Sequence, residues 1–574
     1  MSAARVSAAT VRAAGRLILT VDETGRITSV ADRRRPERPY LACVDLGTAV
    51  VDGEPASWHS REVGLDEDEI EVTMHRDSLD VQLRHGLSTG WTTRLLLVNT
   101  GATSLVLDRL PLRVQPAPGR LVTALAAGSR ICWAAMATDG RGPLLTARLT
   151  SGMLDRIEPE RFEFGGLRLA PGQRYVAQLR WEMLATPRSV VAGPGRDVLL
   201  ARTVYEVGEP ALLPEDPDAA LVLPSDVAVD SVEEAGFAGR EICCDNAGRH
   251  RVELRSAEGD VRWELSWVDS LTAQLLTWTE GILTRPRTSA GVVSIEDLPS
   301  AILLQAALGT GGLEEADDAA DALDLVTARL LDDPESGRAA GPLAVLYLLG
   351  EHGRTGDRDA FGAALTRAET LLTGLERTTP GLGLAVLRMV LATASSDLGP
   401  SAAGRVGSVV ARSVALVAQG SGWREDAEPE STSGPPHVGP AAAADRVRQA
   451  AELELLLAVQ PLLPPDQADD ERMSQLVRGL GAALGSGLPG QLLRPPPVAE
   501  HAYLVAVLQM LPEDGYSDIT RSWGMPLTLL GRQTTLQVLD RLTFGVDAKL
   551  TAEVDLGSHN ATAAGWLALV QRHE

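Results

Sequence analysis

Apolar and polar residues alternate in short runs along the first part of the chain. Arg16–Val21 reads RLILTV, the turn formers Asp22–Gly25 follow, and the alternation resumes at Arg26–Val30. A period of two residues is typical of a strand with one buried face, so this stretch predicts a β-hairpin.

Similar runs continue to residue 267, separated by turn formers such as Asn99-Thr100-Gly101 and Ala170-Pro171-Gly172. Many strands with short connections require two stacked antiparallel sheets rather than one open sheet. The predicted strands are Glu69–His75, Leu79–Arg84, Thr92–Asn99, Ser104–Val114, Arg130–Ala135, Leu144–Leu149, Phe162–Leu169, Tyr175–Trp181, Arg240–Cys244, Arg249–Ser256 and Val261–Trp267.

After Trp267 the apolar residues recur with the period of a helix. Val268–Leu283 predicts a linker helix, and from Ile295 onward amphipathic segments end at Gly, Pro or Asp. The pattern predicts domains at 1–267 and 295–574, joined by a linker helix and loop over 268–294. The predicted helices include Leu298–Leu308, Ala316–Leu331, Ala340–Leu349, Arg358–Leu375, Leu382–Ala394, Ala402–Ala418, Ala441–Val459, Asp470–Leu484, Ala499–Leu511 and Ala561–Arg572.

The segment Leu346–Phe361, LYLLGEHGRTGDRDAF, indicates how these helices are joined. An apolar helix ends near a polar turn at Thr355-Gly356-Asp357, and an amphipathic helix follows from Arg358. This is a helical hairpin, and repeated hairpins stack into bundles, solenoids or closed rings.

A large β-sandwich followed by a linker helix and helical hairpins resembles the supersandwich plus (α/α)6-toroid architecture of carbohydrate-active families. These include glucoamylase-like hydrolases and disaccharide phosphorylases. The resemblance is carried by the strand pair Leu95–Leu110, the strand pair Leu167–Trp181, the helix Val268–Leu283 and the hairpin Leu346–Phe361. It implies an antiparallel β-supersandwich, a toroid-like all-α domain and a carbohydrate ligand.

The chain departs from that architecture's usual chemistry in its aromatic content. Sugars pack their C–H faces on aromatic rings, yet Phe, Trp and Tyr make up only 4% of this chain. From Ile295 onward the tryptophans are Trp423, Trp523 and Trp566. The chain could therefore carry the architecture while being catalytically degenerate.

Glycoside hydrolysis needs two carboxylates about 5–10 Å apart. The best candidates are Glu425 and Asp426 in the loop Gln419–Pro440, paired with Asp518. Trp423 in the same loop, with Tyr516 and Trp523 beside Asp518, are candidate substrate-binding residues. Each segment also has a non-catalytic interpretation. Gln419–Pro440 could be a disordered acidic, Pro/Ser-rich insertion, and Pro512–Met525 could be an ordinary connection between two helices.

The net charge and the cysteine spacing exclude several classes of function. A net charge of −24 without a basic cluster argues against nucleic-acid binding. The four cysteines, Cys43, Cys132, Cys243 and Cys244, lack a metal or redox spacing, so we expect free thiols, no metal and no cofactor. No signal peptide or membrane span is apparent, which predicts a cytoplasmic protein.

Two functions remain open. The first is a glycoside-hydrolase-like or carbohydrate-binding protein; if it is an enzyme, it is a glycoside hydrolase or glycoside phosphorylase. The second is a non-enzymatic intracellular scaffold that binds a protein partner through its helical surface. A deep central pocket with Trp423 or Trp523 and two carboxylates would favour an enzyme, whereas a plugged or apolar centre would favour a scaffold.

Overall fold

The computed structural model describes residues 9–570 with internal gaps. The gaps are 57, 125–126, 130–131, 139–141, 159, 187–201, 215–218, 235–236, 257–258, 287–290, 396–397, 421–439, 464–469, 486–490, 493–494, 514, 524 and 546–557.

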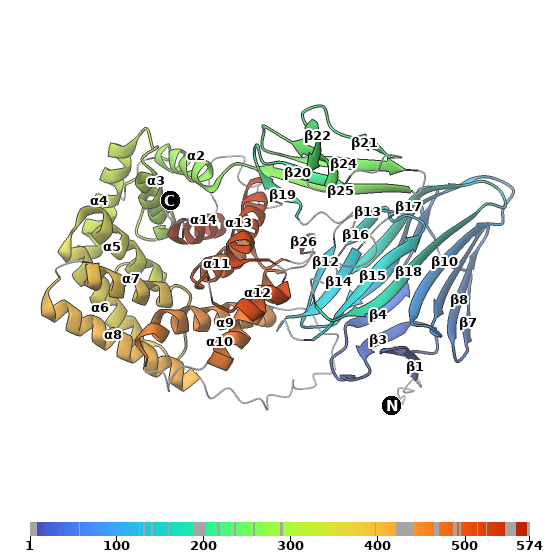
Figure 1. The fold of residues 1–574 in the computed structure, drawn as a ribbon, viewed down its shortest axis with the longest axis horizontal. Helices are drawn as coiled ribbons and strands as arrows, with labels where there is room; N and C mark the ends of the chain where they lie inside the picture. Colours follow the sequence, from blue (N-terminus) through green and yellow to red (C-terminus); the bar gives the residue numbers. More distant parts are fainter. Residues whose placement is uncertain are drawn as a thin grey trace. The chain divides into compact units, whose positions relative to one another are not determined.

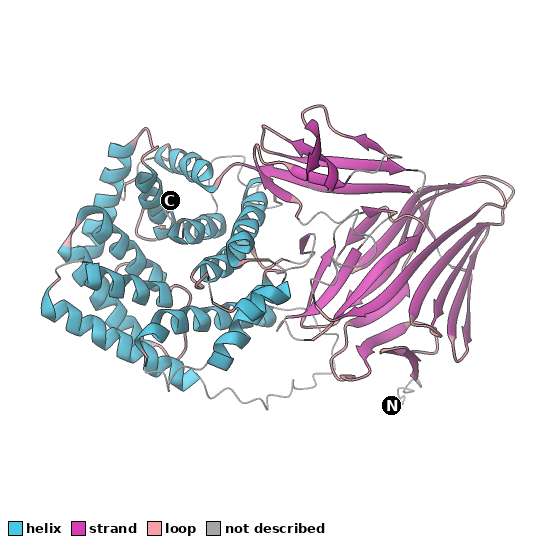
Figure 2. Ribbon diagram, in the orientation of Figure 1, coloured by secondary structure: helices cyan, strands magenta, loops and turns pink. Residues whose placement is uncertain are grey.

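The chain divides into two compact units (Figure 1). The β unit comprises Met1–Trp267 with two later returns of the chain, Gly485–Arg494 and Ser522–Gly524. The helical unit comprises Val268–Leu484, Pro495–Arg521 and Met525–Glu574. Figure 2 shows the predicted fold class, a multidomain β plus α chain with antiparallel sheets followed by helices, and confirms it.

Two large sheets of the β unit enclose one hydrophobic core, which draws residues from both. The first has the order β1 (Thr10–Ala14), β2 (Leu17–Val21), β3 (Ile27–Asp32), β4 (Leu41–Leu46), β11 (Leu105–Pro116), β17 (Arg161–Leu169) and β16 (Arg156–Glu158), with β5 (Ala49–Val51) and β6 (Glu54–Ala56) beside β11. The second has the order β26 (Gln491–Leu492), β12 (Arg120–Ala124), β14 (Cys132–Ala137), β15 (Leu144–Ser151), β18 (Arg174–Leu184), β10 (Trp91–Asn99), β9 (Leu79–Gly86), β8 (Glu69–Arg76) and β7 (Ser60–Leu65).

The alternation predicted from the sequence is visible strand by strand. Along β9 every second residue from Leu79 to His85 is buried. The predicted hairpin is β2 and β3, whose turn is held by the Asp22 carboxylate, which accepts from the Thr24 N–H at 2.9 Å. Gly25 takes a φ of 76° there, a conformation that favours glycine.

Two smaller sheets form a second core between residues 205 and 267. One contains β13 (Ala127–Gly128), β25 (Gly259–Val268), β24 (Gly248–Ser256) and β21 (Ala220–Val222), with β19 (Val204–Glu206) beside β25. The other contains β20 (Ala211–Pro214), β23 (Phe237–Cys243) and β22 (Ala228–Glu234).

The helices of the second unit contact one another in a closed succession. The order is α3 (Leu298–Thr310), α5 (Pro342–Thr355), α7 (Leu382–Ser395), α9 (Pro440–Val459), α11 (Val498–Gln509) and α14 (Ser558–Val570), which returns to α3. Helices α3, α5, α7, α9 and α11 also contact helices outside the succession. The outside helices are α2 (Leu271–Leu283), α4 (Ala316–Asp332), α6 (Arg358–Gly374), α8 (Gly399–Gly420), α10 (Asp470–Ala483) and α13 (Leu527–Phe544). The remaining helix is α12 (Ser517–Trp523), and short 3-10 turns lie at Arg338–Ala340 and Gln460–Leu462.

One helix among those described, Gly399–Ala418 within α8, is long and apolar enough to cross a membrane by length and composition, with a mean hydropathy of 1.2. It contacts α6, α7 and α9. A single helix of this kind is a weak indication, because core helices of globular proteins pass the same test.

Candidate functional site

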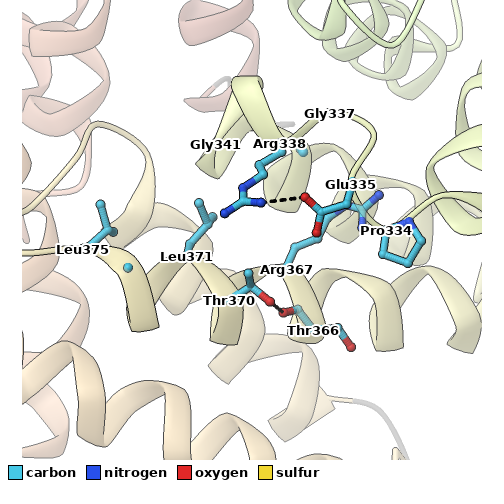
Figure 3. Close-up of a pocket in the computed structure, with 12 residues that line it drawn as sticks. Pro334, Glu335, Gly337, Arg338, Gly341, Thr366, Arg367, Thr370, Leu371 and Leu375 are labelled. Carbon is cyan, nitrogen blue, oxygen red and sulfur yellow. Dashed lines mark hydrogen bonds and ion pairs between the residues drawn. The ribbon is translucent and has the colours of Figure 1, made fainter.

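A pocket of about 270 Å³ lies in the helical unit between the α4–α5 connection and α6 (Figure 3). Ligand pockets typically measure about 300–1,000 Å³, so this one has room for a single small group. We call it the Arg367 pocket. It is lined by Pro334, Glu335, Gly337, Arg338, Gly341, Ala344, Thr366, Arg367, Thr370, Leu371, Gly374 and Leu375.

The connection above the pocket is shaped by one proline and two glycines. Pro334 ends α4, because a proline disfavours helical geometry in the residue before it. That residue, Asp333, is extended, with φ −126° and ψ 105°. Gly337 and Gly341 have φ values of 71° and 55°. A Cβ at Gly337 would also lie 2.9 Å from the Leu330 side chain, so the turn depends on a glycine there.

Arg367 brings a buried positive charge to the pocket. Its Nη2 donates to the carbonyls of Leu330 at 2.7 Å, Asp333 at 3.1 Å and Ser336 at 3.2 Å, while its buried Nε has no hydrogen-bond partner. Burial lowers the pKa of this guanidinium. The hydrogen bonds found for Arg367 go to backbone carbonyls rather than to a carboxylate, although the charges of Asp333 and Glu335 also act favourably on the guanidinium.

The other polar groups around the pocket are more exposed. Arg338 and Glu335 form an ion pair at 2.7 Å, with side chains 70% and 68% exposed. Thr370 Oγ1 donates to the Thr366 carbonyl at 2.9 Å. Glu335 is the single carboxylate among the described lining residues, so this pocket lacks the carboxylate pair that glycoside hydrolysis requires. Its chemistry suits binding of a small anionic group.

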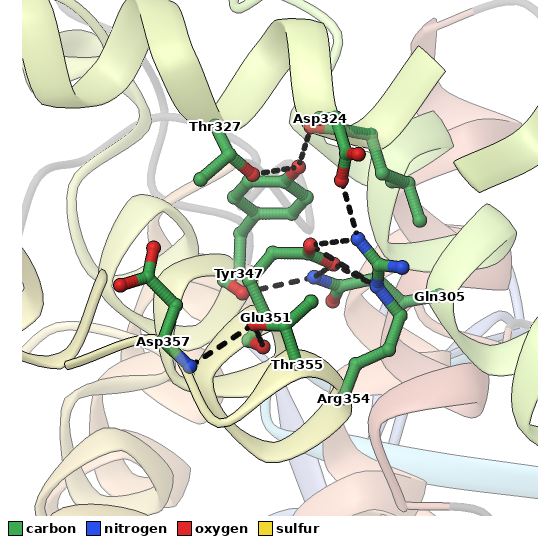
Figure 4. A network of polar contacts seen from close by, with 9 residues as sticks. Gln305, Asp324, Thr327, Tyr347, Glu351, Arg354, Thr355 and Asp357 are labelled. Atoms are coloured by element: carbon green, nitrogen blue, oxygen red, sulfur yellow. Dashed lines mark hydrogen bonds and ion pairs between the residues drawn. The ribbon is translucent and has the colours of Figure 1, made fainter. Parts of the chain in front are cut away.

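A second polar cluster surrounds the α5–α6 hairpin that the sequence singled out (Figure 4). Glu351, which is 1% exposed, accepts from Gln305 Nε2 at 2.6 Å and from Arg354 Nη2 at 2.6 Å. The same Arg354 nitrogen reaches Asp324 at 2.8 Å, and these contacts raise the pKa of Arg354. The buried carboxylate is thus paired and tied to three helices, which indicates a structural role.

A third cluster lies where α7, α9 and α11 meet. The Glu454 carboxylate on α9 accepts from the backbone N–H groups of Gly381 at 2.9 Å and Leu384 at 2.8 Å, and from the Tyr503 hydroxyl at 2.5 Å. Burial raises the pKa of Glu454 to about 7, although the three donors oppose that rise. The Tyr503 ring packs on Trp566 of α14 with centroids 4.9 Å apart.

That third cluster is closed to ligands in this conformation. Glu454, Tyr503 and Trp566 are 1%, 2% and 6% exposed. A Cβ at Gly381 would lie 2.9 Å from the Trp566 ring and 3.3 Å from the Leu346 side chain, so the side chains here are tightly packed. A carboxyl with a pKa near 7 is suited to proton transfer, but this one has no access for a substrate.

The residues predicted from the sequence lie elsewhere. Glu425, Asp426 and Trp423 fall in 421–439, outside the described residues. Asp518 is exposed in the first turn of α12, and Tyr516 precedes that helix with a φ of 57°. Trp523 is 7% exposed and groups with the β unit. Of the three that the structure describes, Asp518, Tyr516 and Trp523, none lines the Arg367 pocket, and the predicted roles of all six residues remain predictions.

The sequence analysis did not identify Arg367, although a signal was present. On α6 it follows Ala364 and Leu365 and precedes Ala368, all of them buried. An arginine at a buried position of an amphipathic helix must find hydrogen-bond acceptors inside the protein, so its presence there indicates a structural or functional role.

Comparison with known proteins places the fold among solved structures but not in a sequence family. No family model and no well-characterised protein sequence matches the chain. A solved structure described as a polysaccharide lyase is similar over 92% of this chain and 93% of its own, with a TM-score of 0.65 and 10% sequence identity. At that identity the likeness concerns the fold, which is found in a carbohydrate-active protein.

Proposed function

We propose that the chain is a carbohydrate-binding protein that takes an acidic saccharide unit in the Arg367 pocket. The observation that carries this is the buried guanidinium of Arg367, which makes no hydrogen bond to a carboxylate and whose Nε has no partner, in a pocket of about 270 Å³. A carboxylate on a sugar would give the guanidinium a charge-assisted partner, and the pocket's threonines are neighbours suited to hydroxyl groups.

The arrangement of the helices supports the carbohydrate-active part of the proposal. The closed succession of contacts from α3 through α14 and back is what an (α/α)6 toroid requires. Together with the fold likeness to a polysaccharide lyase, it favours the resemblance inferred from the sequence.

Catalysis is a finer proposal that depends on different residues. A hydrolytic or phosphorolytic reaction would use Glu425 or Asp426 with Asp518 as the carboxylate pair, and Trp423, Trp523 and Tyr516 for sugar contacts. Replacing Glu425 or Asp426 singly by Gln or Asn would then lower the rate at least about 100-fold while affecting binding much less. Glycosidase activity that survived both substitutions would rule out this pair.

A non-enzymatic scaffold is the second candidate, and one observation favours it. Glu454, Tyr503 and Trp566 fill the region where successive helices of the ring meet. Their tight packing leaves no room for a substrate at this place. A protein that binds no saccharide of any charge would fit this alternative.

The proposed binding is tested by calorimetric titration with two matched ligands. One is an oligosaccharide that contains glucuronate or galacturonate, and the other is the same oligosaccharide after reduction of its carboxyl groups. A hydrogen bond to a charged group contributes about 1.5–3 kcal/mol, so the neutral ligand should bind at least about 10-fold more weakly.

Variants connect the binding to the pocket. Arg338→Ala and Thr370→Val should each weaken binding of the acidic ligand, whereas Arg532→Ala, an exposed arginine on α13, should not. Arg367→Lys keeps the charge while changing the geometry and should give an intermediate affinity. Equal affinity for the acidic and reduced ligands, or unchanged binding by the pocket variants, would contradict the proposal.

A further inference from the structure

Three potential metal ligands converge in the smaller core of the β unit. They are Asp226, which precedes β22, Cys244, which follows β23, and His250 on β24. One ligand atom from each lies within 4.8 Å of the other two. We propose that these residues bind a thiophilic divalent cation, Zn²⁺ in the cell, a site independent of the Arg367 pocket.

The Cys244–His250 pair has the spacing of two ligands on one zinc ion. Cys244 Sγ lies 3.5 Å from His250 Nε2. Zinc–sulfur and zinc–nitrogen bonds of about 2.3 and 2.0–2.1 Å at a tetrahedral angle put the two ligand atoms about 3.5 Å apart. The two buried ligands therefore need no rearrangement to share an ion.

Gly248 lies close to the histidine of this group. A Cβ placed on Gly248 would lie 2.7 Å from His250 Nε2, with 3.3 and 3.7 Å to the two ring carbons beside that nitrogen. Any side chain at residue 248 would therefore crowd the His250 ring on the side of the nitrogen that faces Cys244.

Asp226 completes the set from the solvent side. Its Oδ2 lies 3.5 Å from His250 Nδ1, and its side chain is 51% exposed against 8% for the histidine. An exposed carboxylate can rotate at little cost, so Asp226 can move its oxygen onto the ion. Three protein ligands with water in the fourth position make a complete tetrahedral zinc site.

The types of ligand select the cation. A thiolate is a soft ligand and imidazole an intermediate one, which favours Zn²⁺ over Mg²⁺ or Ca²⁺. Without metal, the Cys244 thiol donates to the Asn246 carbonyl at 3.2 Å, and binding releases this proton as the thiolate forms. The ion would tie the residue before β22 to the connection after β23 and to β24, which belong to two different sheets.

Cys243 serves as the matched control. Cys244 is buried, whereas Cys243 is half-buried. Cys243 is the neighbour of the proposed ligand in the sequence but is not a member of the group of three ligands.

The test uses the full chain, stripped with a chelator and titrated with Co²⁺ as a probe. We expect one equivalent of Co²⁺ to bind with a thiolate-to-cobalt charge-transfer band and tetrahedral visible bands, both removed by Zn²⁺. Cys244→Ser should abolish the charge-transfer band and weaken binding at least about 100-fold. Cys243→Ser should leave both unchanged.

Two further variants keep the proposal falsifiable if Cys244→Ser perturbs folding. His250→Gln should weaken binding to a similar extent, and Gly248→Ala should weaken it as well, because the added Cβ would displace the His250 ring. Gly248 is not among the glycines with positive φ, so alanine can adopt its backbone conformation. A wild-type chain without the charge-transfer band, or a band that survives Cys244→Ser, would overturn the proposal.

Discussion

The indole rings of Trp91 and Trp181 stack with centroids 4.2 Å apart and an interplanar angle of 11°. Trp133 meets Trp181 edge-on at 5.9 Å, so three tryptophans from β10, β14 and β18 form one cluster in the core of the large sandwich. Two more, Trp263 and Trp267, are buried in the smaller core. Much of the chain's aromatic surface thus stabilises sheets and is not available to stack on sugars.

His85 lies beside this cluster and should make the β unit sensitive to acid. It is fully buried, and burial lowers its pKa to about 3 from an unfolded value of 6.5. Since the folded pKa is depressed, its stabilising contribution is complete above pH 6.5 and is lost as the pH falls toward 3. The loss reaches about 4–5 kcal/mol if the pKa difference is fully expressed.

His85→Gln keeps a polar partner for Thr93 and Trp91 but does not titrate. Denaturant unfolding followed by tryptophan fluorescence should show a flatter decline in stability between pH 6.5 and 4 than in the wild type. An identical pH profile in the two proteins would show that His85 is protonated or exposed in the folded state.

Glu454 should give the helical unit a pH dependence of opposite sign. Its folded pKa of about 7 lies above the unfolded value of 4.5, so the folded state holds the proton more tightly. The resulting stability is complete below pH 4.5 and is lost as the pH rises to 7, by up to about 3 kcal/mol.

Tyr503 provides the control for Glu454. Its hydroxyl donates to the carboxylate and favours the ionised form, so Tyr503→Phe should raise the pKa of Glu454 further. The pH-dependent loss of stability should then still begin near pH 4.5 but extend to higher pH. Glu454→Gln should remove the dependence. The measurement is helical circular dichroism during urea unfolding at pH 4.5 to 8, and a stability that rises over this range in the wild type would contradict the assignment.

Glu351 should be far more important for stability than its partner carboxylate Asp324. Glu351→Ala leaves Arg354 and Gln305 without their buried acceptor, which should cost about 3 kcal/mol. Asp324 also pairs with Arg354 but is 69% exposed, so Asp324→Ala should cost less than about 1 kcal/mol. Equal losses of unfolding free energy in the two variants would show that the network does not act through its buried carboxylate.

Limited proteolysis tests the predicted domain boundary. The segment Thr284–Ala290 lies after α2, and its last four residues fall outside the described part of the chain. A cut there should leave a β fragment resistant to further digestion, identified by mass spectrometry. Early cuts inside Leu95–Trp181 would contradict the domain assignment, because those strands form the centre of the large sandwich.

The sequence predicted best those helices and strands in which buried apolar residues recur at the regular spacing of the element. Strands β2 and β9 alternate strictly. Helix α3 ends within two residues of its expected range, whereas α5 continues six residues beyond its expected end at Leu349. Helix α13 was not predicted because Gln533, Thr534, Thr535 and Asp540 are among its buried residues, which hides the apolar period. Polar residues that bond within the fold look like solvent-facing residues in a sequence.

The candidate sites were less accessible to prediction for a different reason. The Arg367 pocket depends on Gly337 and Gly341 taking positive φ, which places a loop over α6, and glycine alone does not reveal its conformation. Asp226 and His250 are 24 residues apart and meet where the sheet that contains β22 and β23 packs near the sheet that contains β24. Packing between two sheets creates such a group of side chains, and a local sequence pattern does not encode it.

The two-residue strand β26 has a consequence for biosynthesis. It pairs with β12 and so completes an edge of the second large sheet, yet about 370 residues separate the two strands in the chain. At about 5–20 residues per second, a ribosome needs roughly 20 to 70 seconds to add that length. During this interval the newly made sheet presents an unpaired edge at β12, which gives nascent-chain chaperones a defined segment to protect.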